Sequence, residues 1–157
     1  MSSRMAAVLA ISGSQVSQAT TPSLAQRSVY SRSASFTDAG IAHLKNLPLK
    51  SINVNTNSIN DPSLAVFGAM PTLEGIQMDS ALITDDGMPP LANLKNLKRL
   101  RMRFADITGE GFKHIAGLTK LERLELRGTS LDDEGLAVIS SLPHVNYLDI
   151  SECQLVT

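Results

Sequence analysis

One pattern of apolar and small residues occurs twice in succession between residue 100 and residue 139, and every position of the first copy is offset from the second by the same interval. Each copy has two apolar residues separated by one, a third apolar residue five positions later, and then a Thr or Asp, a Gly and two apolar residues. The copies are Leu100, Met102, Ile107, Thr108, Gly111, Phe112, Ile115 and Leu124, Leu126, Leu131, Asp132, Gly135, Leu136, Ile139. Self-similarity with a period of about 20–30 residues predicts a solenoid, in which stacked coils bury a shared core.

The same pattern extends through most of the chain. Its strand-starting residues are Leu9, Val29, Ile52, Ile76, Leu100, Leu124 and Leu148. The intervals between them are equal from Ile52 onward and nearly equal from Val29, so the repeat is regular from residue 29 to residue 155. We therefore expect a single domain over residues 1–157 with about seven strand units. The last unit stops at Thr157, before its helical half, and is incomplete.

Each repeat predicts one short strand and one short helix. Alternation within the strand turns both apolar residues inward and leaves their neighbours on the open face of a parallel sheet. The helical halves begin at residues typical of helix N-caps, namely Thr37, Thr84, Thr108, Asp132 and either Asn60 or Asp61. Pro89 and Pro90 should shorten the helix that they interrupt. The expected fold class is α/β, a right-handed solenoid with short parallel strands on the concave face and short helices on the convex face.

These units resemble leucine-rich repeats in which Thr or Asp, two residues, Gly and an apolar residue open the helical half. Such repeats are common in bacterial repeat proteins and similar to the cysteine-containing class of eukaryotes. At the inward position where the family has Asn or Cys, this sequence has Ala34, Asn57, Ala81, Ala105, Thr129 and Cys153. A continuous asparagine ladder is therefore not expected. The resemblance implies a curved solenoid whose concave sheet binds other proteins, and in eukaryotes such arrays often select substrates for ubiquitin ligases.

The segment before the first regular repeat, residues 1–23, allows several interpretations. Leu9 and Ile11, followed by Val16, fit a first and irregular repeat strand. The apolar run from Met5 to Ile11 and the small residues up to Ala19 also fit a short signal peptide, and a capping or disordered segment is a third possibility. The sequence favours a cytoplasmic protein unless residues 1–19 are a signal peptide, which would indicate secretion.

Composition and spacing argue against several classes of function. Fourteen basic residues against fifteen acidic residues give a net charge of −1, which provides no general attraction to nucleic acid. The longest strongly apolar run is far shorter than the roughly 18 residues of a membrane-spanning helix. His43, His114 and His144 do not converge, and no zinc spacing or phosphate-binding loop occurs. We expect no enzyme activity, no cofactor and no metal.

The open face of the predicted sheet carries a cluster of arginine and aromatic residues. Its members are Arg99, Arg101, Arg103, Phe104, Arg123, Arg127 and Tyr147. Asp79, Glu125 and Asp149 border it. One interpretation is a solvated face whose charges neutralise one another. The other is a hot-spot patch for an acidic protein segment, because arginine binds carboxylates in bidentate fashion and aromatic residues dominate interface energies.

The sequence therefore predicts a non-catalytic module that binds a partner protein, with an acidic segment as one candidate ligand, on its concave sheet. Two alternatives remain open. The chain could be a structural unit that makes contacts, including self-association, through uncapped solenoid ends. It could also be the substrate-recognition arm of a larger protein, such as a receptor resembling those of ubiquitin ligases.

Overall fold

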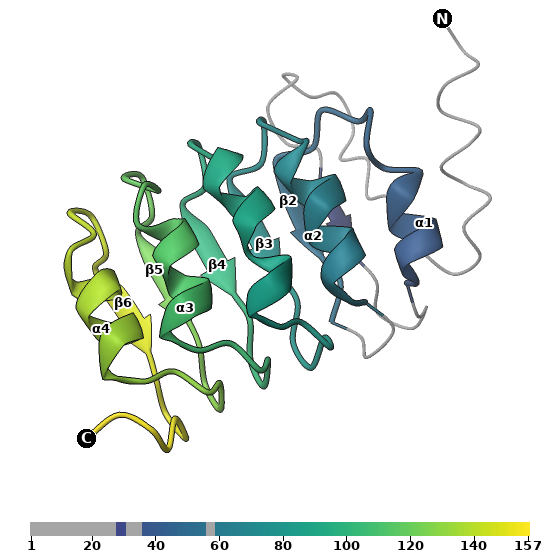
Figure 1. The fold of residues 1–157 in the computed structure, drawn as a ribbon. Coiled ribbons are helices and arrows are strands. Elements are labelled where there is room, and N and C mark those ends of the chain that lie inside the picture. The colour runs from purple at the N-terminus through teal and green to yellow at the C-terminus, as the bar shows by residue number, and fades with distance from the viewer. Residues whose placement is uncertain (1–27, 31–35, 56–58) are drawn as a thin grey trace, which may run out of the picture.

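Six parallel strands form one open sheet in the computed structural model, which describes residues 28–30, 36–55 and 59–157 (Figure 1). The strands are β1 (Ser28–Tyr30), β2 (Ser51–Asn53), β3 (Gly75–Gln77), β4 (Arg99–Arg101), β5 (Arg123–Glu125) and β6 (Tyr147–Asp149). Their spatial order equals their order in the sequence. The strand unit expected at Leu9 and the alternatives for residues 1–23 lie outside the described residues.

The register of the sheet confirms the sequence period. Each strand-starting apolar residue pairs with the equivalent residue one repeat later, so that Val29 faces Ile52, Ile76 faces Leu100 and Leu124 faces Leu148. Because successive coils contain nearly the same number of residues, each strand returns beside its predecessor without a shift. Equivalent residues of neighbouring repeats are consequently neighbours in space.

Short helices cover the opposite side of the coil (Figure 1). They are α1 (Asp38–Ala42), α2 (Asp61–Gly68), the 3₁₀ helices η2 (Asp85–Gly87) and η3 (Pro89–Asn93), α3 (Gly109–Phe112), the 3₁₀ helix η4 (Lys113–Ile115) and α4 (Asp133–Ser140). The expected interruption occurs at Pro89 and Pro90, where two 3₁₀ turns replace a continuous α-helix.

The core lies between the sheet and the helices. The inward strand residues Ile76, Leu100 and Leu124 are 0–1% exposed, because each is covered by the coils on both sides. In the last described coil, by contrast, Leu148 is 37% exposed and Leu155 is 55% exposed. Apolar side chains of the repeat pattern therefore reach solvent at this end of the described sheet.

Aspartates at the helix starts connect one repeat to the next. Asp85 accepts hydrogen bonds from the backbone N–H of Thr108 at 2.8 Å, from its hydroxyl at 2.6 Å and from the Gly111 N–H at 3.1 Å. Asp61 binds the N–H and hydroxyl of Thr84 in the same way, at 2.9 and 2.8 Å. These carboxylates thus satisfy backbone donors at the start of the following helix, which otherwise lack partners within it.

The same contact explains the glycine of the repeat pattern. A Cβ atom added at Gly111 would collide with Oδ1 of Asp85. Glycine is therefore required there by the close approach of the preceding repeat.

Candidate binding surface on the sheet face

The sheet face is the surface formed by side chains of β1–β6, and of the turns that follow these strands, that point away from the core. All the residues predicted for the cluster lie on β4, β5 and β6 or directly after them: Arg99, Arg101, Arg103, Phe104, Arg123, Arg127 and Tyr147. The strand register places Arg99 beside Arg123 and Arg123 beside Tyr147. Folding thus brings the predicted cluster together, as the repeat spacing requires.

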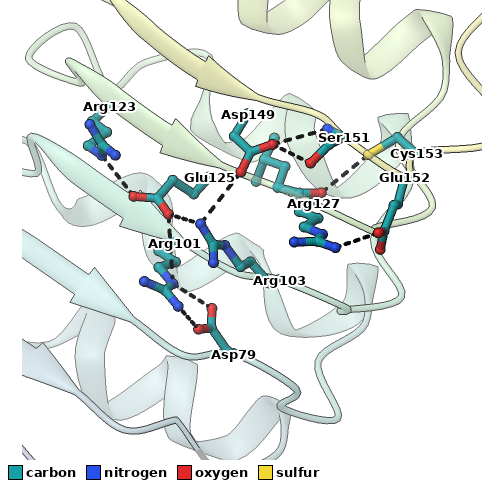
Figure 2. Close-up of polar contacts among 11 residues, drawn as sticks. Asp79, Arg101, Arg103, Arg123, Glu125, Arg127, Asp149, Ser151, Glu152 and Cys153 are labelled. Atoms are coloured by element: carbon teal, nitrogen blue, oxygen red, sulfur yellow. Dashed lines mark hydrogen bonds and ion pairs between the residues drawn. The ribbon is translucent and has the colours of Figure 1, made fainter.

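Arg101 and Arg103 are engaged by carboxylates on this face (Figure 2). Arg101 donates to both oxygens of Asp79, with its Nε at 2.8 Å from Oδ1, and this pairing raises the pKa of the guanidinium. Arg103 donates to Oε2 of Glu125 and lies 3.5 Å from Asp149. Both arginines are only half-buried, so each still reaches solvent.

Glu125 is the acceptor that several arginines share. Only 8% of this residue is exposed, and its Oε1 accepts a hydrogen bond from Nε of Arg123 at 2.8 Å, whereas its Oε2 binds Arg103 (Figure 2). Burial alone would raise the pKa of Glu125, but the hydrogen bond from Arg123 and the charges of Arg103 and Arg101 lower it. The carboxylate is therefore ionised at neutral pH, and its negative charge compensates part of the positive charge of the surrounding arginines.

Two guanidiniums also lie over aromatic rings. The guanidinium carbon of Arg123 is 3.5 Å from the ring centroid of Tyr147, a close cation–π contact. Arg127 pairs with Glu152 at 2.5 Å, and its guanidinium carbon is 6.0 Å from the ring centroid of Phe104.

Arg99 differs from the other four arginines. Its side chain is exposed and forms no ion pair with any described residue. The Arg99 side chain lies next to Gly75, because a Cβ atom added at Gly75 would stand 3.7 Å from Nε of Arg99. A shallow hollow lies here, lined by Ile76, Gln77, Arg99, Leu100, Arg101, Arg123 and Glu125. Arg99 is thus a cation at the border of a polar hollow, free to meet an external anion.

Phe104 is an exposed aromatic residue in an unusual backbone conformation. Its φ is +59° and 51% of it is exposed. The equivalent positions of three repeats are also left-handed, with Ser80, Gly128 and Glu152 at φ of 56°, 68° and 62°. Such a turn favours glycine and costs a phenylalanine roughly 1–2 kcal/mol. The ring lies against Gly128, where an added Cβ would approach it to 2.6 Å.

The pairing partners show where sequence reasoning was incomplete. Asp79, Glu125 and Asp149 were expected beside the cluster and do pair with it. Glu152, the partner of Arg127, was missed, although it stands one repeat after Gly128 and two after Phe104. Comparing residues at this turn position across repeats would have placed it on the same face.

The described part of the chain also shows how possible metal ligands are placed, what one histidine contacts and how long the helices are. Within residues 28–30, 36–55 and 59–157, no three His, Cys, Asp or Glu side chains are grouped so that they could hold a metal ion. His144 contacts the carbonyl oxygen of Thr119 at 2.7 Å, in a turn between repeats. In the same ranges, no helix has the length and apolar character needed to cross a bilayer.

Similarity to known proteins agrees with this geometry. Residues 93–116 and 117–140 each match the family model described as Leucine Rich repeat. No curated protein matches the chain by sequence. Among solved structures, an internalin (inlF) from Listeria monocytogenes is similar with a TM-score of 0.69 and 23% identity, over 82% of this chain and 35% of that chain.

Two further structures are similar at lower identity. Internalin C2 from Listeria monocytogenes has a TM-score of 0.55 and 17% identity, over 83% of this chain and 73% of that one. The leucine-rich-repeat ectodomain of the receptor kinase SOBIR1 from Arabidopsis thaliana has a TM-score of 0.56 and 16% identity, over 91% and 78%. The chain spans about a third of the length of the inlF structure, at 35%.

Proposed function

We propose that this chain, as a leucine-rich-repeat protein, binds a partner protein on its sheet face. The contact is made with an acidic segment of that partner. Leucine-rich-repeat folds generally mediate protein–protein interaction and are generally non-catalytic. The candidate contact residues are the arginines and aromatic residues of β4–β6 and the turns after them. The leucine-rich-repeat fold supports protein binding as the class of function. The arginines and aromatic residues of the sheet face support this face as the place where the partner binds.

The observation that carries the proposal is the exposure of Phe104 beside the arginines. A left-handed turn would accommodate glycine at lower cost, and a polar residue would leave less apolar surface in water. Phe104 nevertheless has 51% of its surface exposed, with Arg127 above its ring. Strained and exposed apolar residues are concentrated at binding sites, where a partner covers them.

Site-specific photo-crosslinking tests the location of binding. A benzoylphenylalanine replaces Tyr147 on the sheet face, or, as the control, the exposed Ala65 of α2 on the helical side. We expect one protein of a native lysate to crosslink from position 147, to be displaced by excess unlabelled chain, and not to crosslink from position 65. Crosslinking from position 65 alone, or specific crosslinking from neither position, would contradict the proposal.

The purified partner then allows a quantitative test. Phe104→Ser should weaken its affinity at least tenfold, because a buried aromatic anchor contributes more than about 1.4 kcal/mol to an interface. Lys45→Glu, in the turn after α1, is the matched surface control and should leave the affinity unchanged.

A second candidate function is assembly through the last described coil. Half-buried and exposed apolar residues line a groove there, among them Leu136, Val145 and Leu148. Sedimentation equilibrium over a hundredfold range of concentration tests this function. Self-association that Leu148→Asp abolishes would support it, whereas a concentration-independent mass would count against it.

A further inference from the structure

We infer that the partner segment on the sheet face is mixed in character, with one carboxylate placed at Arg99 and one apolar side chain placed on Phe104. This inference rests on the proposed function and specifies its ligand. It excludes a polyacidic segment, which a face with five arginines would otherwise suggest.

Most of the positive charge of the arginine cluster on the sheet face is already paired. Four of the five arginines already have carboxylate partners in Asp79, Glu125, Asp149 and Glu152. Among the described residues of this face, only about one positive charge therefore remains uncompensated. A run of acidic residues would meet four resident carboxylates as well as the arginines, and like charges at such distances repel.

Arg99 is the unpaired cation among the described residues of this face. Its exposed guanidinium stands at the hollow beside Arg101 and Arg123, whose carboxylate partners are Asp79 and Glu125. Gly75 contributes no side chain that could cover the approach. A carboxylate entering this hollow can accept two parallel hydrogen bonds from Arg99 without displacing any ion pair present on the face.

Phe104 supplies the apolar contact. Half of its surface is in water, while its other side is held by Gly128, so the ring forms a fixed apolar surface. An aliphatic or aromatic partner side chain packed on this ring would remove apolar area from water at about 25 cal/mol per Å². An acidic partner side chain would bury little apolar area on that ring and would find no cation–π attraction there.

The spacing of the two positions constrains the partner sequence. Arg99 begins β4, and Phe104 follows five residues later in the turn after this strand. At about 3.3 Å per extended residue, and with a turn that shortens the path, the Cα atoms of the two residues lie roughly 10–16 Å apart. An extended partner segment covers that distance with its acidic and apolar residues about three to five positions apart.

Selection from a displayed library of random 12-residue peptides tests the inference on the full chain. The wild-type protein is the bait, and Arg99→Gln/Phe104→Ser is the counter-selection bait. We expect enriched peptides to contain one Asp or Glu and one large apolar residue three to five positions away. Fluorescence anisotropy of a selected peptide should show at least tenfold weaker binding to Arg99→Gln.

A matched peptide isolates the charge contact. When the acidic residue of the selected peptide is changed to its amide, wild type should lose at least tenfold in affinity, whereas Arg99→Gln should lose less than twofold further. Circular dichroism and the urea midpoint verify that both protein variants are folded, which the exposure of both residues leads us to expect. Additive losses in this cycle would overturn the pairing of the carboxylate with Arg99.

Other outcomes of the selection overturn the inference as a whole. Enrichment of peptides with three or more acidic residues and no apolar residue would do so, as would the absence of enrichment. If a protein still crosslinks from position 147, the proposed function stands and only this account of the ligand fails. If no protein crosslinks specifically from that position, the proposed function itself fails.

Discussion

At the scale of single residues, Glu125 has the largest structural role on the sheet face. It is almost completely buried and pairs with Arg103 and Arg123, and its Oε2 is 3.8 Å from Arg101. Removing one member of such a pair leaves charged groups without a partner, which costs more than the pair contributes by itself. The arginines therefore depend on Glu125 for their positions as well as for their neutralisation.

Glu125→Gln should lower the free energy of unfolding by about 1–3 kcal/mol, measured by urea denaturation. The loss is smaller than for a fully buried pair, because a quarter of the Arg103 side chain is exposed, at 25%. Glu152→Gln is the matched control, since Glu152 is exposed and Arg127 is the one described residue with which it forms an ion pair. Equal urea midpoints for Glu125→Gln and the wild type would disprove the role assigned to Glu125.

Phe104 shows a limit of residue-level interpretation. The repeat pattern places an aromatic residue beside the arginines, but residue type alone does not indicate whether its ring is packed or in water. The left-handed turn directs the side chain onto Gly128 and leaves half of it exposed. The backbone conformation of Phe104, and not its hydrophobicity, therefore decides that its ring is available for contact with a partner.

At the scale of elements, the carboxylates at the helix starts act between repeats. The sequence predicts N-caps at Thr37, Thr108 and Asp132, and each does accept a hydrogen bond from its own helix. Thr84 also precedes its helix, but its hydroxyl donates to Asp61 and forms no cap bond of its own. Acidic residues at the helix starts, such as Asp61 and Asp85, thus connect adjacent coils.

Asp85→Ala should destabilise the chain by about 1–2 kcal/mol, because the N–H groups of Thr108 and Gly111 and the Thr108 hydroxyl lose their acceptor. Asp86→Ala is the control one residue away, since the Asp86 side chain is exposed and forms no hydrogen bond or ion pair with the described residues. Urea denaturation of both variants measures the difference. Equal losses would indicate that only the charge near the helix start matters.

At the scale of the whole molecule, folding lowers the pKa of carboxylates throughout the repeats. The residues concerned include Asp38, Glu74, Glu125, Asp132, Asp149 and Glu152. At Asp38, burial opposes the shift, but hydrogen bonds from Ser63 and Asn60 outweigh it and lower the pKa. The unfolded chain therefore binds more protons than the folded chain as the pH falls through this range.

The free energy of unfolding should consequently be nearly constant around neutral pH and decrease as the pH falls below the ordinary carboxyl pKa values of 3.8 and 4.5. Stability is present above the unfolded-state pKa and is lost through the lower pKa values of the folded state. Urea midpoints between pH 7 and pH 3 measure this dependence. Constant or rising stability toward pH 3 would contradict it, and Glu125→Gln should show a weaker dependence than wild type.

The amino-acid sequence by itself determined the coil. The nearly constant spacing of apolar residues can be read directly from the chain. The two apolar residues of each strand are buried against the next repeat in only one register of the sheet, so this spacing specifies how the coils stack. Strand positions, their pairing and the gathering of the arginines on one face follow from that spacing, and the described part of the chain, from β1 onward, has them as expected.

Only the tertiary structure decided which of these side chains are available. A long side chain such as arginine can reach several carboxylates on neighbouring coils, and the sequence spacing does not show which of them it pairs with. Spacing alone therefore could not show that Arg99 lacks an ion pair among the described residues while four arginines have one, namely Arg101, Arg103, Arg123 and Arg127. The approach of Asp85 to Gly111 and the exposure of Phe104 likewise depend on how adjacent coils pack. Periodicity specifies which residues become neighbours, whereas side-chain packing across the coils determines the contacts they make.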